Sequence, residues 1–181
     1  MNEYHTTNAE YALEDYDPHW KVKFEEMKVM LQGVFGAKAL QIEHVGSTSV
    51  EGMKAKPVID ALVVVSDMGD ISMEKKELEK LGYIYRNDYV AESSLFMCKE
   101  EGSRRLENIH IMPEGHERIA TFIDKRDYLR AHPEEARRYE EVKHMLNEKF
   151  PEDYAAYKAG KEDYLNHELV EKMAAWRREG K

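Results

Sequence analysis

The spacing of hydrophobic residues predicts a helix early in the chain and a helical segment at its end. The first helix is expected to start near Pro18 and to end at Gly36. From about Pro113 the pattern is again helical, and Pro133 and Pro151 each precede two acidic residues, as at a helix start. The apolar positions of the first helix lie three or four residues apart: Trp20, Phe24, Met27, Leu31 and Val34.

The segment between these helical parts has the pattern of strands. Apolar and polar side chains alternate along residues 40–45, as in a strand with one buried face. Residues 57–65 are apolar on both faces except for Asp60, which is typical of a central strand covered on both sides. One more helix is predicted at residues 71–81. Three more strands are predicted at residues 83–89, 94–98 and 106–112.

These elements predict an α/β protein of the α+β type, with a mixed β-sheet, flanking helices and a helical C-terminal third. The chain has 181 residues, enough for one ordinary domain. We expect residues 1–115 to form the α/β domain. Residues 116–181 are expected to form a helical C-terminal extension packed on it, so that both parts make a single structural unit.

The charge balance restricts the classes of ligand. Acidic residues outnumber basic ones by 36 to 27, and the formal net charge is -9. No non-specific nucleic-acid binding and no membrane binding are expected, because both need a broad basic surface. A few well-placed lysines and arginines are still enough to hold the phosphates of a nucleotide.

Two further features favour a cytoplasmic protein. The single cysteine, Cys98, cannot form an intramolecular disulfide, as expected in a reducing compartment. The first residues lack the basic and apolar regions of a signal peptide, and the longest apolar stretches, around Asp60, are too short to span a bilayer.

The segment from His44 to Asp60 contains the most informative chemistry. Gly46 allows the backbone to approach a ligand closely, and the hydroxyl and N–H groups of Ser47 and Thr48 can receive phosphate oxygens. Asp60 lies in an otherwise apolar strand, so we expect its carboxylate to be paired, hydrogen-bonded or bound to a cation. The structural alternative is that Asp60 accepts hydrogen bonds from N–H groups of the Gly-Ser-Thr loop.

Several motifs resemble those of a known family. Gly46-Ser47, followed after ten residues by an apolar strand with an acid, resembles the signature of the nucleotidyltransferase superfamily. More narrowly, the chain resembles the GrpB family from about Tyr16 to the last helix. This resemblance implies a nucleotidyltransferase-like fold, and the fusion of this domain to dephospho-CoA kinase in other members points to nucleotide or coenzyme A metabolism. The segments that carry it are Tyr16-Asp17-Pro18-His19-Trp20, Ile42–Val50, Lys56-Pro57-Val58-Ile59-Asp60 and Arg126-Asp127-Tyr128-Leu129-Arg130.

One departure from the superfamily pattern concerns the acids. Active nucleotidyltransferases carry two acids two residues apart on this strand, and a third on a neighbouring strand, to hold divalent metal for phosphoryl transfer. Val58 occupies the first of the paired positions here, and Asp60 the second. A lone carboxylate is a poor Mg²⁺ site unless phosphates or other side chains complete it. The expectation of two-metal catalysis is therefore weakened.

Two histidines are candidates to complete such a site. His110 shares one face of its predicted strand with Asn108, and His44 lies beside the Gly-Ser loop. The family pattern on the later strand resembles His-x-His, which makes Asn108 a departure and His110 the retained member. His44, Asp60 and His110 form a candidate ligand set for a transition metal. Hydrogen-bonded structural histidines are the alternative.

Two basic residues are candidates for binding phosphate. Lys56 precedes Pro57, which restricts the backbone of the lysine to an extended form. Arg126 and Arg130 are one helical turn apart and can face one patch. The family resemblance favours a functional role for Lys56 and Arg126, and ion pairs with Asp127 and nearby glutamates are the alternative.

These features predict a nucleotide-handling protein and leave three hypotheses. The first is transfer of a nucleotidyl group with Mg²⁺ or Mn²⁺ as cofactor and Asp60 as catalytic residue. The second is a non-catalytic module that binds a nucleotide, coenzyme A or another phosphorylated small molecule. The third is a metal-dependent enzyme that uses His44, Asp60 and His110. The residues expected to bind substrate are Gly46, Ser47, Thr48, Lys56 and Arg126.

Overall fold

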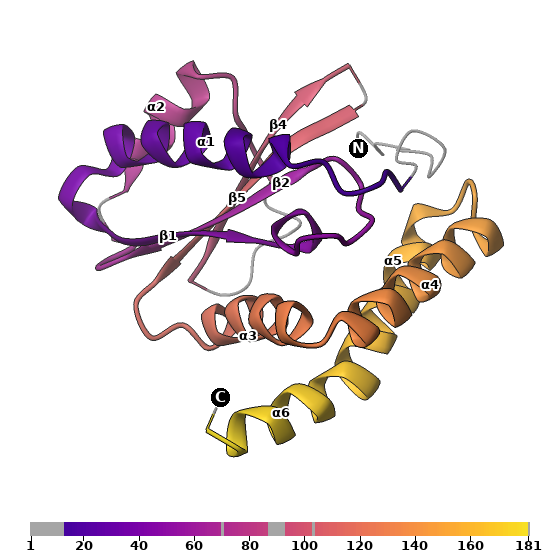
Figure 1. Ribbon diagram of the computed structural model, residues 1–181. Helices are drawn as coiled ribbons and strands as arrows, with labels where there is room; N and C mark the ends of the chain where they lie inside the picture. Colours follow the sequence, from indigo (N-terminus) through magenta and orange to yellow (C-terminus); the bar gives the residue numbers. More distant parts are fainter. Residues whose placement is uncertain (1–12, 70, 87–92, 103, 181) are drawn as a thin grey trace.

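The chain folds into a mixed sheet with helices on both faces, followed by a group of C-terminal helices (Figure 1). The structure, a computed structural model, describes residues 13–69, 71–86, 93–102 and 104–180. The helices are α1 (His19–Phe35), α2 (Ser72–Lys80), α3 (Glu117–Ala131), α4 (Pro133–Lys149), α5 (Tyr154–Tyr164) and α6 (Val170–Arg178). The strands are β1 (Ala39–Val45), β2 (Ile59–Val65), β3 (Ile84–Tyr85), β4 (Leu95–Glu101) and β5 (Arg104–Pro113).

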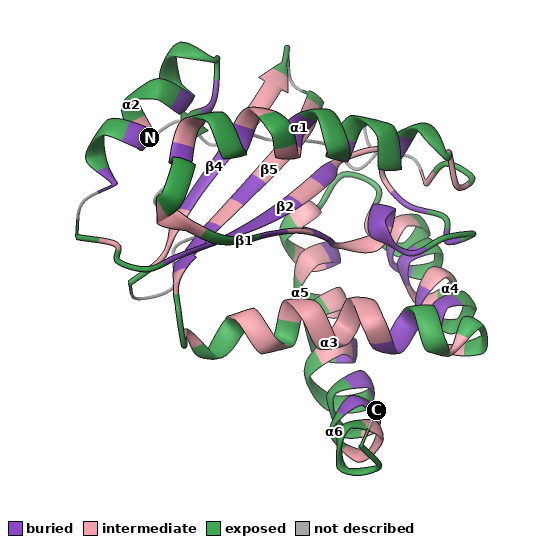
Figure 2. Ribbon diagram, turned by 60° about the vertical axis from the view of Figure 1, so that its left-hand side comes forward, coloured by how far each residue is buried: buried purple, intermediate pink, exposed green. Residues whose placement is uncertain are grey.

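The sheet has five strands in the order β1-β2-β5-β4-β3. β2 pairs in parallel with β5, while the other three pairings are antiparallel. The apolar run predicted as a central strand is β2, which lies between β1 and β5 and is buried along nearly its whole length. Figure 2 shows this band of buried residues across the middle of the sheet. The predicted mixed sheet with flanking helices is confirmed.

The two faces of β2 contribute to different hydrophobic clusters. Ile59, Ala61 and Val63 pack in the cluster formed with α1 and α2. Leu62 and Val64 face the other way and pack with Ile119, Phe122 and Ile123 of α3. Since side chains alternate along a strand, Asp60 lies on the α3 face.

The C-terminal helices pack on this layer through a cluster of their own. It combines residues of α3, α4 and α6 with Val50 and Met53, which follow the Gly-Ser loop. α5, a π-helical segment (Leu165–Leu169) and α6 follow one another without a break, so they form one long helix. We had expected this helix to start at Pro151, but it begins at Tyr154, where the Asp153 side chain accepts a hydrogen bond from the N–H group of Ala156.

The remaining predicted elements agree with the structure, apart from their bounds. The strand expected at residues 83–89 appears as β3, and its residues 87–89 lie outside the described part of the chain. β5 begins two residues before the predicted strand. Among the described residues, no helix is both long enough and apolar enough to cross a membrane.

Two helical glycines predict opposite responses to the same substitution. A Cβ atom on Gly33 of α1 would have no heavy atom within 4 Å, whereas one on Gly160 of α5 would lie 2.5 Å from Cδ2 of the buried Leu146 on α4. Alanine is the better helix former, so Gly33→Ala should raise the free energy of unfolding by about 1 kcal/mol. Gly160→Ala should lower it by about 1 kcal/mol or more through overpacking. Urea unfolding of both variants checks this, and stabilisation by both would contradict the close packing of α4 and α5.

Candidate functional site

Asp60 is at the centre of the candidate site, on the sheet face that α3 covers. The parallel register of β2 and β5 places Asp60 opposite Asn108, and the same alternation places His110 on this face. The Asn108 side chain donates a hydrogen bond to Asp60 Oδ1 at 2.8 Å, and His110 Nε2 lies 3.5 Å from the same oxygen. Within the described chain, these side chains hold the carboxylate instead of the loop N–H groups that we considered as an alternative.

The pKa of Asp60 reflects these contacts. Burial raises the pKa of this carboxyl group, but the hydrogen bonds and charge of His110, the hydrogen bond of Asn108 and the charge of Lys125 lower it, and the net pKa lies below its ordinary value. Asp60 is therefore a carboxylate at neutral pH.

Gly46 brings the loop directly onto this carboxylate. Its backbone has a φ of 74°, and a Cβ atom at this position would lie 2.4 Å from Asp60 Oδ2. Only glycine meets both the positive φ and the close approach. Ser47, the next residue, is thereby held at the rim of the same site.

The other two hydroxyl groups of the loop have partners in the protein. Thr48 Oγ1 donates to the carbonyl of Val58 and lies 3.1 Å from His44 Nε2. A hydroxyl group has one proton, so His44 Nε2–H must be the donor to Thr48. Ser49 Oγ donates to the Gly46 carbonyl at 2.6 Å. These bonds tie the loop to β1 and to the start of β2, and they leave Ser47 as the hydroxyl that faces the cleft described below.

His44 lies on the opposite face of the sheet from Asp60. Its ring stacks on Phe24 of α1, with ring centroids 4.5 Å apart, and it is buried. The antiparallel register pairs Val45, rather than His44, with Asp60. The candidate ligands His44, Asp60 and His110 therefore do not converge. Among the described residues, no group of three or more His, Cys, Asp or Glu side chains is placed to hold a metal ion.

A cleft with two lobes runs between the sheet and the C-terminal helices, past Asp60. The inner lobe is a cavity of about 190 Å³ and the outer lobe is one of about 600 Å³. Residues that border both lobes are Ser47, Asp60, Arg105, Asn108, Tyr139, Tyr154 and Lys161. The inner lobe is also lined by Lys56, Val58, Lys143 and Tyr157. The outer lobe is also lined by Phe96, His110, Phe122, Lys125 and Met173.

Lysines dominate the charge of this cleft. Lys143 of α4 is buried, and its Nζ donates to the Lys54 carbonyl at 2.7 Å and lies 3.4 Å from Ser47 Oγ. The Nζ of Lys56 lies over the rings of Tyr154 and Tyr157, 5.2 Å and 4.2 Å from their centroids. Together with Lys125 and Lys161, these lysines surround the Asp60 carboxylate.

Burial makes these ammonium groups unusually acidic. It lowers the pKa of Lys56 and of Lys143 to about 7, and that of Lys125 to about 8. Burial also lowers the pKa of Lys161, which in turn lowers the pKa of the other three by repulsion. Glu140 opposes the shift at Lys143, and Asp60 opposes it at Lys125 and Lys161. The cleft thus concentrates positive charge that the protein only partly neutralises.

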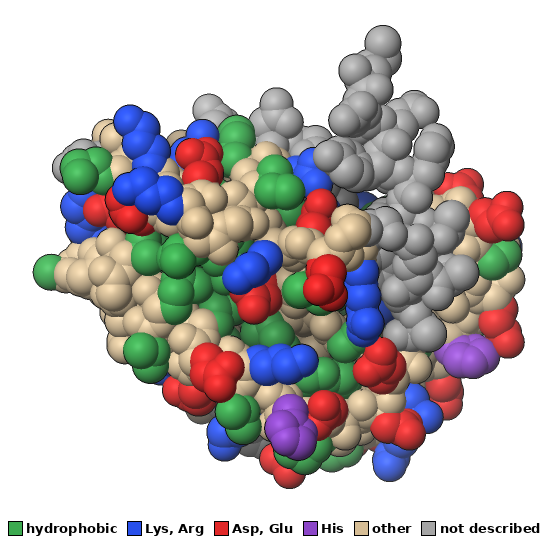
Figure 3. All heavy atoms as spheres, turned by 90° about the horizontal axis from the view of Figure 1, so that it is seen from above, with side chains coloured by type: hydrophobic (Ala, Val, Ile, Leu, Met, Phe, Trp, Pro, Cys, Tyr) green, Lys and Arg blue, Asp and Glu red, His purple; other side chains and the backbone are tan. Residues whose placement is uncertain are grey.

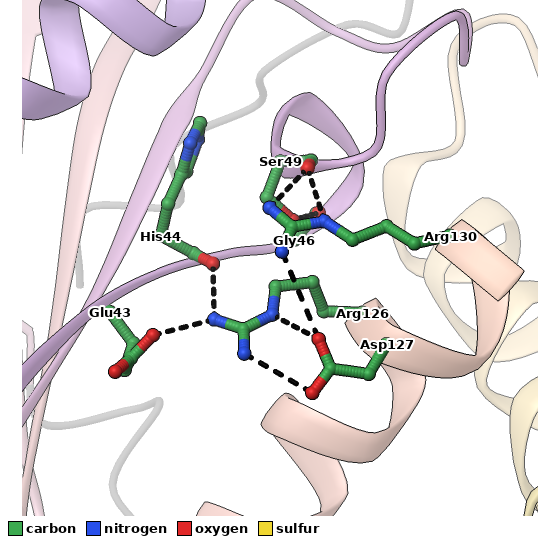
Figure 4. A network of polar contacts seen from close by, with 7 residues as sticks. All are labelled: Glu43, His44, Gly46, Ser49, Arg126, Asp127 and Arg130. Atoms are coloured by element: carbon green, nitrogen blue, oxygen red, sulfur yellow. Dashed lines mark hydrogen bonds and ion pairs between the residues drawn. The ribbon is translucent and has the colours of Figure 1, made fainter. Parts of the chain in front are cut away.

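Arg126, which we expected to bind substrate, contacts protein groups outside the cleft (Figure 4). Its guanidinium donates to Glu43 Oε2 at 2.7 Å, to the His44 carbonyl at 3.2 Å and to both oxygens of Asp127. Arg130 donates twice to the Ser49 carbonyl. Both arginines therefore link α3 to the end of β1 and to the loop, while the His44 ring points away from them.

Of the predicted site residues, the structure gathers Gly46, Ser47, Lys56, Asp60 and His110 around the cleft. Thr48 lines the inner lobe but uses its hydroxyl internally. Sequence reasoning missed Lys143 and Lys161. A signal was available: Lys143 follows Tyr139 by four residues, and Lys161 follows Tyr157 by four, so both lysines lie on the buried stripes of their helices.

Comparison with known proteins identifies the family. The family described as "GrpB protein" matches residues 10–171. A UPF0157 protein of Halalkalibacterium halodurans is 39% identical over 140 residues, which cover 77% of this chain and 70% of that protein. The chain belongs to the GrpB family.

Further relatives place this GrpB-family chain among solved structures and longer proteins. The crystal structure of the conserved protein GrpB from Enterococcus faecalis is 28% identical, with a TM-score of 0.76 over 86% of this chain and 98% of that one. A dephospho-CoA kinase of Mycolicibacterium paratuberculosis is 26% identical over 173 residues, which cover 82% of this chain and 42% of that protein.

More distant structures share the fold. A cytoplasmic RNA terminal U-transferase matches with a TM-score of 0.51 and 13% identity, over 75% of this chain and 41% of the transferase. The Cid1 poly(U) polymerase, in a structure with bound MgGTP, matches with a TM-score of 0.50 and 15% identity, over 75% of this chain and 44% of the polymerase. The sheet and its flanking helices thus resemble the nucleotidyltransferase fold.

The residues of this GrpB-family chain do not fit a two-metal centre of the kind used in nucleotidyl transfer. Val58 lines the inner lobe where the first acid is expected, and the side chain opposite Asp60 on β5 is the amide of Asn108. Mg²⁺ prefers a cage of oxygen ligands, and the two carboxylates of the described cleft lining, Asp60 and Glu162, do not supply it among the ammonium groups.

The buried His44 predicts a pH dependence of stability. Burial lowers the pKa of His44 from its ordinary 6.5 to about 4, against the opposing charge of Asp60. The folded state then binds fewer protons than the unfolded state between these values, so this stability is fully present above pH 6.5 and is lost as the pH falls towards 4. Between pH 7 and pH 5, the native chain should lose about 2 kcal/mol more unfolding free energy than His44→Gln.

Urea titrations at the two pH values measure this difference. His144→Gln is the matched control, since the His144 side chain is 69% exposed, and it should retain the native pH dependence. Equal losses in the native chain and in His44→Gln would show that His44 does not stay neutral in the folded state.

Proposed function

We propose that this GrpB-family chain binds a nucleotide or another phosphorylated small molecule in the two-lobed cleft, and that it does so with ammonium groups instead of a divalent metal. The observation that carries the proposal is the lysine cluster. In the described lining of the cleft, the carboxylates of Asp60 and Glu162 face five lysines: Lys56, Lys125, Lys143, Lys158 and Lys161. Clustered, partly desolvated cations are costly unless an anion neutralises them.

The inner lobe is the expected place of the phosphates. Lys143 and Ser47 are already within 3.4 Å of each other there, so one phosphate oxygen could accept from both. Lys56 also lines the inner lobe, with its ammonium group over the rings of Tyr154 and Tyr157. A bound phosphate would restore the full charge of these lysines, because an adjacent anion raises the pKa of an ammonium group.

Nucleotidyl transfer is the less favoured alternative. It is supported by the fold shared with the terminal U-transferase and with Cid1, whose structure holds MgGTP. The possible metal ligands argue against it. The two positions beside Asp60 where acids would be expected hold Val58 and Asn108. Binding without transfer requires only the groups that line the cleft.

Coenzyme A is the second ligand class to test beside nucleotides. The reason is the relative named dephospho-CoA kinase, in which a region similar to this chain makes up 42% of the protein. Coenzyme A carries several phosphate groups, so it presents the same anionic chemistry to the lysines.

The lysine proposal predicts binding that does not need metal. Isothermal titration with ATP, inorganic triphosphate and coenzyme A in EDTA should give saturable binding by at least one of them. Lys143→Met should weaken it about tenfold, as expected for loss of one charge-assisted contact. Affinity should also fall as the pH rises from 7 to 9, because burial lowers the pKa of Lys56 and Lys143 to about 7 and neutral lysines do not attract phosphate.

Two further variants separate this effect from a loss of structure. Lys161→Met removes a cleft lysine that makes no hydrogen bond to the loop, and it should weaken binding to a similar degree. Lys149→Met changes an exposed lysine on the same helix as Lys143 and should leave binding unchanged. Binding that appears only with Mg²⁺ or Mn²⁺ would contradict the proposal.

The role of Asp60 gives an independent test. In a metal-free site its carboxylate repels phosphate, so Asp60→Asn should strengthen the binding of inorganic triphosphate, on the order of tenfold for one charge removed at short range. In a metal-dependent site the same variant should abolish binding. Titration in EDTA and in Mg²⁺ distinguishes the two outcomes by their opposite signs.

A further inference from the structure

The outer lobe of the cleft has the chemistry of a subsite for a planar ring. The His110 ring lies between two phenylalanine rings, with centroids 4.9 Å from Phe96 and 4.7 Å from Phe122. The guanidinium groups of Arg105 and Arg118 each lie 5.7 Å from one of these phenylalanine rings. Aromatic rings and guanidinium planes are the surfaces on which nucleobases stack.

The C-terminal helices contribute three apolar residues to this lobe, beside the polar Lys158, Lys161, Glu162 and Asn166. Leu165 begins the π-helical segment, Val170 begins α6, and Met173 follows one turn later. The unbranched thioether of methionine adapts to the shape of a ring that packs against it. Single π-helical turns within longer helices are frequent at functional sites, and this one places Leu165 and Asn166 in the lobe.

The two lobes differ in the size of group that they can hold. At about 190 Å³, the inner lobe is below the roughly 300–1,000 Å³ that is usual for a complete small-molecule site. The outer lobe, at about 600 Å³, lies within that range. Because Ser47, Asp60 and Lys161 border both, one extended molecule can occupy the two lobes together.

We infer that the outer lobe binds the heteroaromatic base of a nucleotide whose phosphates lie in the inner lobe, an inference that rests on the proposed function. The base stacks against the Phe96–His110–Phe122 row and is closed in by Leu165, Val170 and Met173. The ligand class is thereby narrowed from phosphorylated molecules in general to nucleoside phosphates, including nucleotide-containing cofactors, and inorganic phosphates fill only the inner lobe.

The test compares ATP with inorganic triphosphate by isothermal titration in EDTA. The native chain should bind ATP more tightly than inorganic triphosphate, by about five- to a hundred-fold, as base stacking on one aromatic surface provides. Phe122→Ala should remove most of this preference and leave the affinity for inorganic triphosphate unchanged. Phe122→Leu, which keeps much of the volume but not the ring, should have the same effect and serves if the alanine variant does not fold.

Ile123→Ala is the matched control. Ile123 packs in the same hydrophobic cluster as Phe122 and is adjacent to it on α3, but it does not line the cleft. This variant should keep the preference for ATP. An ATP affinity no greater than that for triphosphate, or equal losses in Phe122→Leu and Ile123→Ala, would overturn the base subsite while leaving the phosphate site intact. Failure of triphosphate, ATP and coenzyme A to bind would instead overturn the proposed function and the subsite with it.

Discussion

The contact of Gly46 with the carboxylate of Asp60 is the constraint on which the rest of the cleft depends. No side chain fits between them, since a Cβ atom would lie 2.4 Å from Oδ2. The loop therefore lies directly on β2, and Ser47 is directed to the rim. Two arginines of α3 bind this region. Arg126 donates hydrogen bonds to Glu43 and to the His44 carbonyl of β1, and Arg130 donates to the Ser49 carbonyl of the loop. The close contact of the Gly46 backbone with Asp60 thus places the Ser47 hydroxyl group and the Asp60 carboxylate beside the C-terminal helices.

The electrostatics follow from that geometry. The Asp60 carboxylate, stabilised by Asn108 and His110, is surrounded by lysines from the segment before β2 and from three helices. Their pKa values fall because burial and mutual repulsion act in the same direction, and Asp60 offsets only part of the effect. A nucleotidyltransferase would use acids and metal at this place to neutralise phosphate. In the proposed site the ammonium groups would do so, which would account for a Gly-Ser loop beside Val58 at an acidic position.

Much of this arrangement could be predicted from the sequence, because strand alternation and the family motifs are local patterns. They located β2, the Gly-Ser loop and Asp60, and they placed His110 and Asn108 on the same face of β5. The placement of His44 could not be predicted, since it depends on the register between β1 and β2, and a shift of one residue reverses the faces. Lys143 was missed for another reason. A lysine is ordinarily placed on the exposed face of a helix, but Lys143 is buried on the stripe of α4 that holds Tyr139 and Leu146, while Met145 is 56% exposed.

The net charge of the chain and the charge of the cleft have different consequences. On the face that carries α1 and α2, acidic and basic side chains are interspersed (Figure 3), and the whole chain carries a formal charge of -9. Long-range repulsion from such a chain opposes the binding of a large polyanion such as a nucleic acid, because many of its phosphates must approach the outer surface. A small anion can enter the cleft, where the lysines are within a few ångströms and the repulsion from distant acids is screened by salt. An acidic protein with a cationic cleft is expected to discriminate by size among phosphate-bearing ligands, and this supports the proposal of a free nucleotide, as opposed to a nucleic acid, as the occupant.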